Sequence, residues 1–311
     1  MGRIKEYLNK SYLYRRIAAK IHARSVKKDP RMEMNRYYSS VWGFEPNIDN
    51  PTDLIEKTYW LLLNTDTSLW SLCADKYRVR EYVQSKGLQE FLSKPLGVWE
   101  DPASIDFTKL PDEFILKTNN GCGTCHVVND KNAVQKEAII RILKQDLSIP
   151  FGYAGAQLHY LSIKPCVIAE ELLHGDAEQN ALSPNSLIDY KVWCINGQPE
   201  SILIVYDRRG HHYCLDLYDT NWKRMSDKMQ PCEGCEYRDG EIPKPPCLEQ
   251  MLEMASKLSE PFPEVRVDFY IVDGKPVIGE LTFTTGFGYF TKDYYNYLGS
   301  KMDLTKNTIK K

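Results

Sequence analysis

Residues 265–283, VRVDFYIVDGKPVIGELTF, decide the fold class of this sequence. Two runs of alternating apolar and polar residues flank the four turn residues Asp-Gly-Lys-Pro at 273–276. Alternation with period two on both sides of an Asp-Gly step is typical of a β-hairpin. The first strand carries Asp268 and the second carries Glu280, and counting back across the turn can place the two carboxylates side by side on one face.

This acid pair has two interpretations. Acids that face each other across two strands repel unless a cation lies between them, and Mg²⁺ that bridges phosphate oxygens is the usual solution. Arg266 lies two residues before Asp268 and therefore points to the same face. The alternative is an exposed sheet face on which Arg266 serves as the counter-ion, and these residues alone do not decide between the two.

The remaining chain predicts helices interleaved with hairpins. Residues 188–195 alternate well and are followed, across Asn196-Gly197, by a second alternating run at 199–206. We also expect strands at 114–117, 125–128 and 165–173, and helices at 53–63, 75–86, 136–146 and 249–258. The stretch 95–111 predicts a short strand followed by an irregular link. Because no steady strand–helix–strand rhythm appears, the sequence favours an α+β fold over a doubly wound sheet.

Composition sets broad limits on function. The chain has 311 residues, 42% of them apolar, and a formal net charge of −2, as is typical of a soluble protein with no general attraction to nucleic acid or acidic lipid. It lacks the apolar run of a signal peptide at its N-terminus and any run of about 18 uncharged apolar residues that could span a membrane. We therefore expect a cytoplasmic location.

The first 32 residues differ from this average. They carry ten Lys or Arg against Glu6 and Asp29, and their apolar residues recur near helical spacing: Ile4, Leu8, Tyr14, Ile17, Ala18 and Ile21. Such a basic amphipathic helix can lie on an anionic membrane surface, at the inner face of the membrane. The other interpretation, a helix whose apolar stripe packs on its own domain, is the more common outcome.

The nine cysteines are scattered, as in reduced intracellular proteins. Two pairs, Cys122/Cys125 and Cys232/Cys235, have C-x-x-C spacing, but more than a hundred residues separate them, which disfavours a shared zinc site. A local site that joins Cys232 and Cys235 to Cys247 or a histidine is a further, unsupported alternative.

A strand that ends in lysine runs into a glycine-rich turn. Lys117 is followed by Gly121 and Gly123, and glycines allow backbone N–H groups to approach phosphate oxygens while an ammonium neutralises their charge. Glycines at a hairpin turn are more often turn chemistry alone. A second lysine, Lys76, lies upstream at the start of the predicted helix, where an ordinary surface position is the simpler interpretation.

The order of these features resembles ATP-grasp enzymes, and most closely the TupA-like group, named after teichuronopeptide biosynthesis. The similar segments are DKYRVREYV (75–83), LPDEFILKTNNGCGT (110–124), VIAEELL (167–173), DYKVWCINGQP (189–199) and VRVDFYIVDGKPVIGELTF (265–283). The resemblance implies an ATP-grasp fold, in which two α+β lobes clasp ATP, preceded by a helical extension. It implies four parts: a basic helix at 1–32, a pre-ATP-grasp region at 33–110, a small lobe with the phosphate loop at 111–173, and a large lobe with the magnesium-binding hairpin at 174–311.

The resemblance also implies roles for single residues. Lys76 and Lys117 match the lysines that contact ATP phosphates, and Gly121 and Gly123 match the mobile loop above them. The hinge that receives adenine through backbone groups corresponds to Glu170, Glu171, Leu172 and Leu173, and the carboxylate that holds the ribose corresponds to Asp189. Asp268 and Glu280 match the magnesium ligands, and Arg266 matches the arginine that steadies the tetrahedral intermediate. Lys191 and Arg208 match further contacts to phosphate or acceptor. Thr282 departs from the asparagine that many members have there, so the number of magnesium ions stays open.

The implied activity is a Mg-ATP-dependent carboxylate–amine ligase with an acylphosphate intermediate. Its expected partners are a small-molecule or glycan carboxylate and an amine, in the assembly of a cell-surface polysaccharide. The alternatives are an ATP-dependent sugar or small-molecule kinase, a glycosyltransferase that binds a nucleotide-sugar, and a non-catalytic nucleotide-binding adaptor. The acceptor pocket is expected on loops near 35–50, 205–225 and 284–295.

Overall fold

The computed structural model describes residues 11–306. These residues form two compact units, and the chain passes back and forth between the two. Unit 1 comprises 11–46, 75–77 and 94–172, and unit 2 comprises the segments 47–74, 78–93 and 173–306. Residues 1–10, and with them Ile4 and Leu8 of the predicted basic helix, lie outside the described residues. Each unit is described by itself below.

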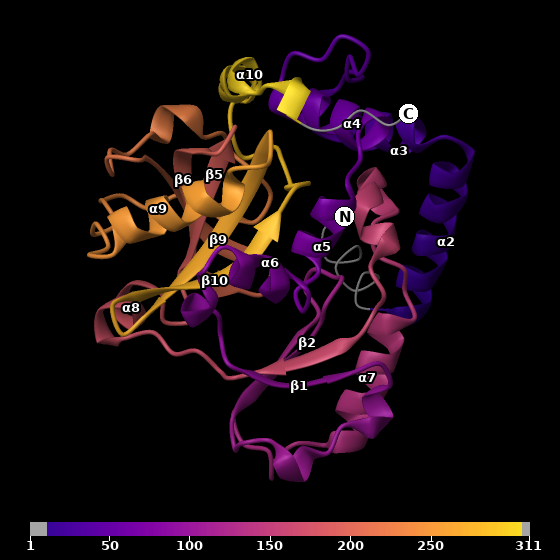
Figure 1. The fold of residues 1–311 in the computed structure, drawn as a ribbon, viewed down its shortest axis with the longest axis vertical. Helices are drawn as coiled ribbons and strands as arrows, with labels where there is room; N and C mark the ends of the chain where they lie inside the picture. The colour runs from indigo at the N-terminus through magenta and orange to yellow at the C-terminus, as the bar shows by residue number, and fades with distance from the viewer. Residues whose placement is uncertain (1–10, 307–311) are drawn as a thin grey trace. The chain divides into compact units, whose positions relative to one another are not determined.

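Unit 1 is a small antiparallel sheet with helices around it (Figure 1). The strand order is β1-β4-β2-β3, formed by β1 (Pro95–Trp99), β4 (Val167–Glu170), β2 (Phe114–Thr118) and β3 (Cys125–Val128). The helices are α2 (Tyr12–Lys28), α3 (Pro30–Trp42) and α7 (Lys136–Leu147). Phe114, Leu116, Val167 and Ala169 are fully buried with Leu143 of α7, so alternate residues of β2 and β4 form the core of this unit.

Unit 2 is built on a six-stranded sheet of order β10-β9-β5-β6-β7-β8. The strands are β10 (Lys275–Thr282), β9 (Glu264–Val272), β5 (Asp189–Ile195), β6 (Gln198–Arg209), β7 (His212–Asp219) and β8 (Cys235–Glu236), antiparallel except for the β7–β8 pair. The helices are α4 (Leu54–Asn64), α5 (Ser68–Ala74), α6 (Val79–Ser85), α8 (Ala177–Leu182), α9 (Leu248–Ser259) and α10 (Lys292–Lys301). Helix α9 packs on β5, β6 and β9 (Figure 1). Two units of helices and antiparallel strands confirm the predicted α+β class.

Both predicted hairpin turns are present. Asn196 and Gly197 have φ of 53° and 83°, and Asp273 and Gly274 have φ of 49° and 71°. Two consecutive residues with positive φ are what a two-residue hairpin turn of type I′ requires. These turns fix the β5–β6 and β9–β10 pairings that carry most of the candidate site.

Several predicted elements differ in extent. The helix predicted at 75–86 begins only at Val79, because Asp75 Oδ1 accepts from the backbone N–H of Tyr77 and so caps a turn rather than a helix. The region 205–225 is not a loop: β6 continues to Arg209 and β7 follows. Asp216, buried in β7 against Arg224, conceals that strand by placing a charge within its apolar pattern. Helices α3 and α10 likewise occupy parts of the other two predicted pocket loops, 35–50 and 284–295.

Candidate active site

Lys117 lies near the end of β2 with its ammonium against a carboxylate. Its Nζ is 2.5 Å from Oε2 of Glu170 on the neighbouring strand β4, and both side chains are largely buried. The sequence assigned Glu170 to the adenine hinge through its backbone. In the structure its side chain also orients Lys117, a role that the sequence pattern did not reveal.

The turn between β2 and β3 is held at its beginning. Asn119 donates its side-chain N–H to the carbonyl of Lys164 and its backbone N–H to the carbonyl of Cys166. The Nζ of Lys76 donates to the carbonyl of Gly121 at 2.8 Å, and the Lys76 N–H donates to the carbonyl of Asn119. The structure thus brings Lys76 to the turn that follows Lys117, and binding of phosphate by the two lysines stays a prediction.

The two glycines of the turn are required for different reasons. A Cβ on Gly121 would lie 2.9 Å from the Thr118 hydroxyl, so a side chain there would collide. Gly123 has a φ of +72° with open space around it, so its requirement is conformational. Beyond Gly121 the turn is exposed and includes Cys122, so its glycines fit a segment over which backbone N–H groups can approach an anion.

The predicted adenine hinge follows β4. The backbone N–H of Glu171 donates to the carbonyl of Lys94, and its carboxylate accepts from the N–H of the same residue at 2.7 Å. This double contact fixes the hinge at the end of β4 and occupies the Glu171 N–H. Leu172 ends the last segment of unit 1, and Leu173 begins the last segment of unit 2.

In unit 2, Asp268 and Glu280 are direct partners across β9 and β10. A straight count from the turn would pair Asp268 with Gly279 and place Glu280 on the other face. A register shift between Ile278 and Glu280 corrects this, and a β-bulge of this kind re-aims a side chain at sheet edges and active sites. A Cβ on Gly279 would lie 3.0 Å from the Tyr270 ring, which is why a glycine suits the bulge.

Two cations neutralise Asp268. Arg266 binds it with two parallel hydrogen bonds of 2.6 and 2.7 Å, and Lys191, its direct partner on β5, lies 2.5 Å from Oδ2. Burial opposes ionisation of Asp268, but the charges of Arg266 and Lys191 outweigh it and lower the pKa of this carboxyl. Burial likewise opposes the charge on Arg266, yet Asp268 raises its pKa above the ordinary value. Asp268 is thus held as a carboxylate and Arg266 as a cation.

The same face continues along β5. Asp189 lies 3.5 Å from the Lys191 ammonium and accepts two hydrogen bonds from Arg208, the shorter of 2.7 Å. The pairing of β6 with β7 also shifts register between Tyr206 and Arg209. Arg208 lies within this irregular segment, where the strand bends and the side chain turns to Asp189. Five predicted site residues, Asp189, Lys191, Arg208, Arg266 and Asp268, therefore form one connected network.

Sequence reasoning missed two aromatic members of this network. The Tyr270 hydroxyl is hydrogen-bonded to the carboxylate of Asp189. The charge of Asp189, together with burial, raises the pKa of the Tyr270 hydroxyl well above its ordinary value. Trp193 lies under the Arg266 guanidinium at 5.3 Å, in a cation–π contact that fixes its plane. Each lies two residues from a predicted site residue on the same strand, and this spacing was the signal that could have found them.

The acid pair has the donor chemistry that Mg²⁺ prefers. Glu280 Oε1 accepts a hydrogen bond of 3.1 Å from the hydroxyl of Thr282, which also accepts from Arg266. Carboxylate oxygens at two adjacent positions are a typical partial ligand set for Mg²⁺, which completes its shell with water and phosphate oxygens. Among residues 11–306 no group of three or more His, Cys, Asp or Glu forms a metal site made by protein alone. The set fits a metal that depends on its substrate.

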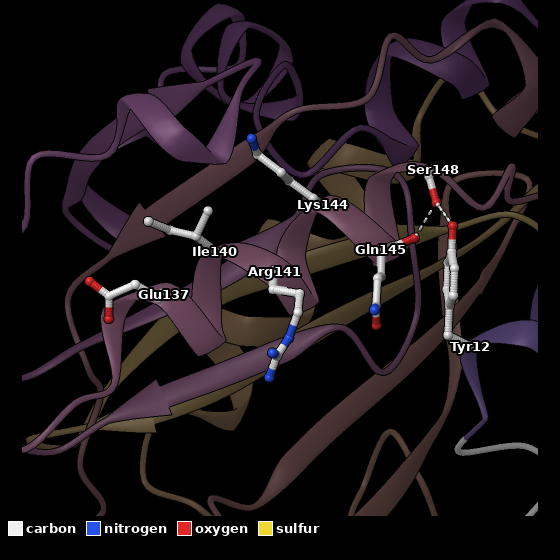
Figure 2. Close-up of a pocket in the computed structure, with 7 residues that line it drawn as sticks. All are labelled: Tyr12, Glu137, Ile140, Arg141, Lys144, Gln145 and Ser148. Atoms are coloured by element: carbon white, nitrogen blue, oxygen red, sulfur yellow. Dashed lines mark hydrogen bonds between the residues drawn. The ribbon is translucent and has the colours of Figure 1, made fainter.

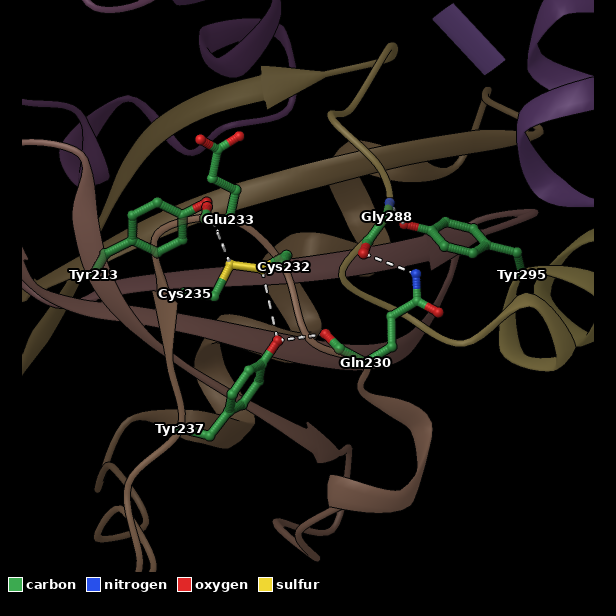
Figure 3. The surroundings of a disulfide bond; sticks show 8 residues. All are labelled: Tyr213, Gln230, Cys232, Glu233, Cys235, Tyr237, Gly288 and Tyr295. Carbon is green, nitrogen blue, oxygen red and sulfur yellow. Dashed lines mark hydrogen bonds between the residues drawn. A yellow bond between two sulfur atoms is a disulfide. The ribbon is translucent and has the colours of Figure 1, made fainter. Parts of the chain in front are cut away.

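A disulfide lies beside a loop of unit 2 (Figure 3). Cys232 and Cys235 are joined, with Cα atoms 5.3 Å apart, so the expectation of reduced cysteines is wrong for this pair and neither thiol is left for zinc. The other seven cysteines are free. Gln230, two residues before the disulfide, donates to the carbonyl of Gly288 at 2.9 Å and thereby connects this segment to the loop after β10.

One surface pocket of about 420 Å³ lies in unit 1 (Figure 2). Its lining is Tyr12, Glu137, Ile140, Arg141, Lys144, Gln145 and Ser148, from the beginning of α2 and along α7. It contains none of the predicted site residues. The candidate active site therefore rests on the two networks above and not on this pocket.

Comparison with known proteins places the chain in a family. A family model described as TupA-like ATPgrasp matches residues 56–303, which is well over half of the chain. No curated protein sequence matches.

Several solved structures are weakly similar. A D-alanine–D-alanine ligase from Bacillus anthracis complexed with ATP shares 13% identity at a TM-score of 0.47, over 83% of this chain and 75% of that one. A D-alanine–D-alanine ligase from Helicobacter pylori shares 15% sequence identity at a TM-score of 0.42, over 79% of this chain and 66% of that one. The ATP-grasp ligase PsnB complexed with its minimal precursor shares 12% sequence identity at a TM-score of 0.37, over 76% of this chain and 62% of that one. The chain thus spans about two thirds of the length of these proteins. The family match confirms the resemblance read from the sequence, and the chain belongs to the TupA-like ATP-grasp family.

Proposed function

We propose that this protein is a Mg-ATP-dependent ligase that joins a carboxylate to an amine through an acylphosphate. The observation that carries the proposal is the row Lys191–Asp268–Glu280 across β5, β9 and β10, with Arg266 bound to its centre. A fixed carboxylate pair flanked by fixed cations suits a reaction that moves a phosphoryl group and then develops an oxyanion.

ATP is the first substrate in this proposal. Lys76, Lys117 and the turn with Gly121 and Gly123 would bind its phosphates, and the hinge after β4 would accept adenine. Asp189 would bind the ribose hydroxyls in exchange for one of its present partners, Lys191 or Arg208. Asp268 and Glu280 would hold Mg²⁺, which supplies charge neutralisation on the phosphates when bound.

The proposed reaction has two steps, phosphoryl transfer and attack of the amine. An oxygen of the acceptor carboxylate attacks the γ-phosphorus, the bond to ADP breaks, and an acylphosphate forms. A neutral amine attacks its carbonyl carbon, phosphate leaves, and the amine loses a proton. Arg266 would stabilise the oxyanion that forms when the amine attacks and that collapses as phosphate leaves, a type of contact worth about 3–4 kcal/mol in other enzymes.

The acceptor class is part of the proposal. Membership of the TupA-like ATP-grasp family supports a carboxylate and an amine as partners. Within the proposal, the acceptor is a cell-surface polysaccharide or its sugar or amino-acid precursor, as the resemblance of the sequence implies. In keeping with this, the half-buried Tyr289 packs edge to face on the buried Trp193 ring that lies under Arg266, and a tyrosine beside arginine suits a sugar acid.

Trapping with hydroxylamine tests the reaction. The protein is incubated with Mg-ATP, candidate uronic or amino acids, and hydroxylamine in place of the amine. The proposal expects a hydroxamate in amounts equal to the ADP released. ADP release without hydroxamate contradicts ligation. A stable phosphorylated acceptor formed without any amine identifies a kinase, and stabilisation by UDP-sugars but not by ATP in a thermal-shift assay identifies a glycosyltransferase.

A further inference from the structure

Helix α2 presents an outer face that its own unit leaves exposed. Four of its large apolar residues are exposed: Leu13 by 64%, Tyr14 by 40%, Ile17 by 50% and Ile21 by 58%. At about 100° per residue they fall within one sector of the helix. The favoured interpretation of the sequence, a stripe that packs on its own domain, is therefore wrong for Tyr14, Ile17 and Ile21.

The inner face of α2 already has its partners. Helix α2 packs on α3 and on the turn Ala154–Ala156, and Val26 is buried there. On this inner side His22 lies 2.9 Å from Glu33, and Arg15 lies 2.9 Å from Asp146 of α7. The helix is thus anchored to unit 1 by one face, and its exposed stripe is not a core surface of this unit.

The charge on α2 has one sign. Between Tyr12 and Lys28 the sequence contains no acidic residue, and its outer basic side chains are all exposed: Arg16, Lys20, Arg24, Lys27 and Lys28. By helical geometry Arg16, Lys20 and Lys27 lie on one side of the apolar stripe, and Arg24 and Lys28 continue the stripe itself toward the C-terminal end of the helix. A stripe of Leu, Ile and Tyr bordered by Lys and Arg has the layout of a helix that lies in a membrane interface.

We infer that α2 is a docking surface for an anionic lipid bilayer, with Ile17 and Ile21 inserted below the headgroups and Lys20 and Arg24 on the anionic headgroups. A second copy of this chain is the weaker candidate because two such basic faces repel each other. Nucleic acid is weaker because phosphate binding does not use a row of aliphatic side chains.

A bilayer surface requires no spanning segment. None of the helices between residues 11 and 306 combines the length and hydropathy that crossing a membrane demands. Helix α2, with 17 residues, is roughly 25 Å long and can lie flat over several headgroups. Tyr14 adds an aromatic ring with a polar tip, a side chain that is enriched at the level of the headgroups.

Vesicle co-sedimentation of the full chain tests the inference. Vesicles of phosphatidylcholine alone are compared with vesicles that also contain phosphatidylglycerol, at low salt and at about 0.5 M salt, where the Debye length is short. The inference expects binding to the anionic vesicles only, weakened by salt. Equal binding to both kinds of vesicle, or to neither, overturns it.

Two pairs of variants separate the contributions. Ile17→Ser/Ile21→Ser is expected to weaken binding roughly tenfold or more. Lys20→Gln/Arg24→Gln is expected to weaken it roughly fivefold for each charge removed. The matched controls are Ile142→Ser/Leu161→Ser, which removes exposed apolar residues elsewhere in unit 1, and Lys244→Gln/Lys275→Gln in unit 2; both should bind as the unchanged protein does.

All substituted side chains lie on the surface, so far-UV circular dichroism should report the same fold for each variant. If the controls weaken binding as much as the α2 variants do, the attraction is general and the docking surface is refuted. If the Ile17→Ser/Ile21→Ser variant changes the oligomeric state in light scattering but not vesicle binding, the face joins copies of the chain and the inference fails.

Discussion

The two parts of the candidate site are built in opposite ways. On the sheet of unit 2, Asp268 is held by Arg266 and Lys191; these two cations are half-buried, Asp268 and Asp189 are buried, and Arg208 is exposed. In the turn of unit 1, Cys122 and Gly123 are exposed, and a Cβ on Gly123 would meet nothing within 4 Å. The difference teaches that charge stabilisation is built in before substrate arrives, whereas the phosphate-covering segment retains room to rearrange.

The largest expected effect comes from breaking the rigid part. Asp268→Asn removes the counter-charge that binds Arg266 and leaves Lys191 with only its longer contact to Asp189, so the free energy of unfolding should fall by about 3–5 kcal/mol and activity by at least ~1,000-fold. Urea unfolding and the hydroxamate assay measure the two losses. Glu249→Gln, an exposed carboxylate on α9, should change neither. A stable Asp268→Asn protein contradicts the interpretation of this network as a prebuilt set of charges.

Next comes the lysine of the turn. Lys117→Met should lower activity about 100- to 1,000-fold through lost phosphate binding and stability by about 1–3 kcal/mol, because Glu170 loses its partner. In the double variant Lys117→Met/Glu170→Gln much of the stability should return while the activity stays low. Recovery of activity along with stability would mean that Lys117 has only a structural role.

A third prediction contrasts two acids on β9. Glu264, four residues before Asp268, has an Oε2 with no hydrogen-bond partner among residues 11–306, and burial raises the pKa of this carboxyl well above its usual value. The folded protein then binds a proton that the unfolded chain releases near pH 4, so stability falls as pH rises through and above that range. Asp268, with its lowered pKa, acts in the opposite direction and loses stability only as pH falls below about 4.

Glu264→Gln should remove that fall. The free energy of unfolding of this variant, minus that of the unchanged protein, should rise with pH above about 4 and then level off. The total rise should be about 1.4 kcal/mol for each unit by which folding raises the pKa of Glu264. Urea unfolding between pH 4 and about 8 measures the difference. A difference that does not depend on pH would show that Glu264 is ionised in the folded protein.

The smallest effects compare two glycines with positive φ. Gly123→Ala meets open space and should cost only the strain of the left-handed conformation, about 1–2 kcal/mol. Gly197→Ala has the same strain, and in addition its Cβ would lie 3.1 Å from the backbone of Glu260. Thermal unfolding should therefore show a larger loss for Gly197→Ala. Equal losses would mean that the turn of unit 1 is packed as tightly as the hairpin of unit 2.

The same contrast separates what the sequence could predict. Alternation and the Asn-Gly and Asp-Gly turns predicted both hairpins of unit 2, because their signals are local. The pairing of Asp268 with Glu280 was predicted by a count that ignored the bulge, and it holds only because the register shifts next to Gly279. A bulge depends on contacts such as that of Gly279 with Tyr270, which neighbouring residues in the sequence do not specify.

Long-range partners were the other gap. The ion pair between Lys117 and Glu170 joins residues far apart in the chain, as does the disulfide segment that Gln230 ties to Gly288. The C-x-x-C spacing of Cys232 and Cys235 was considered only as part of a zinc site, and the scattered cysteines pointed to reduced thiols. The buried Asp216 hid β7 for a similar reason, since its partner Arg224 becomes apparent only in the folded sheet.

The proposed function requires that the lysine turn of unit 1 and the acid pair of unit 2 act on one molecule of Mg-ATP. Isothermal titration calorimetry with a non-hydrolysable ATP analogue and magnesium tests it on three proteins: the unchanged chain, Lys117→Met and Glu280→Gln. The account predicts one binding event per chain, weakened at least about tenfold by either substitution, with magnesium no longer enhancing affinity in Glu280→Gln. Wild-type affinity in either variant, with the magnesium effect retained, would contradict it.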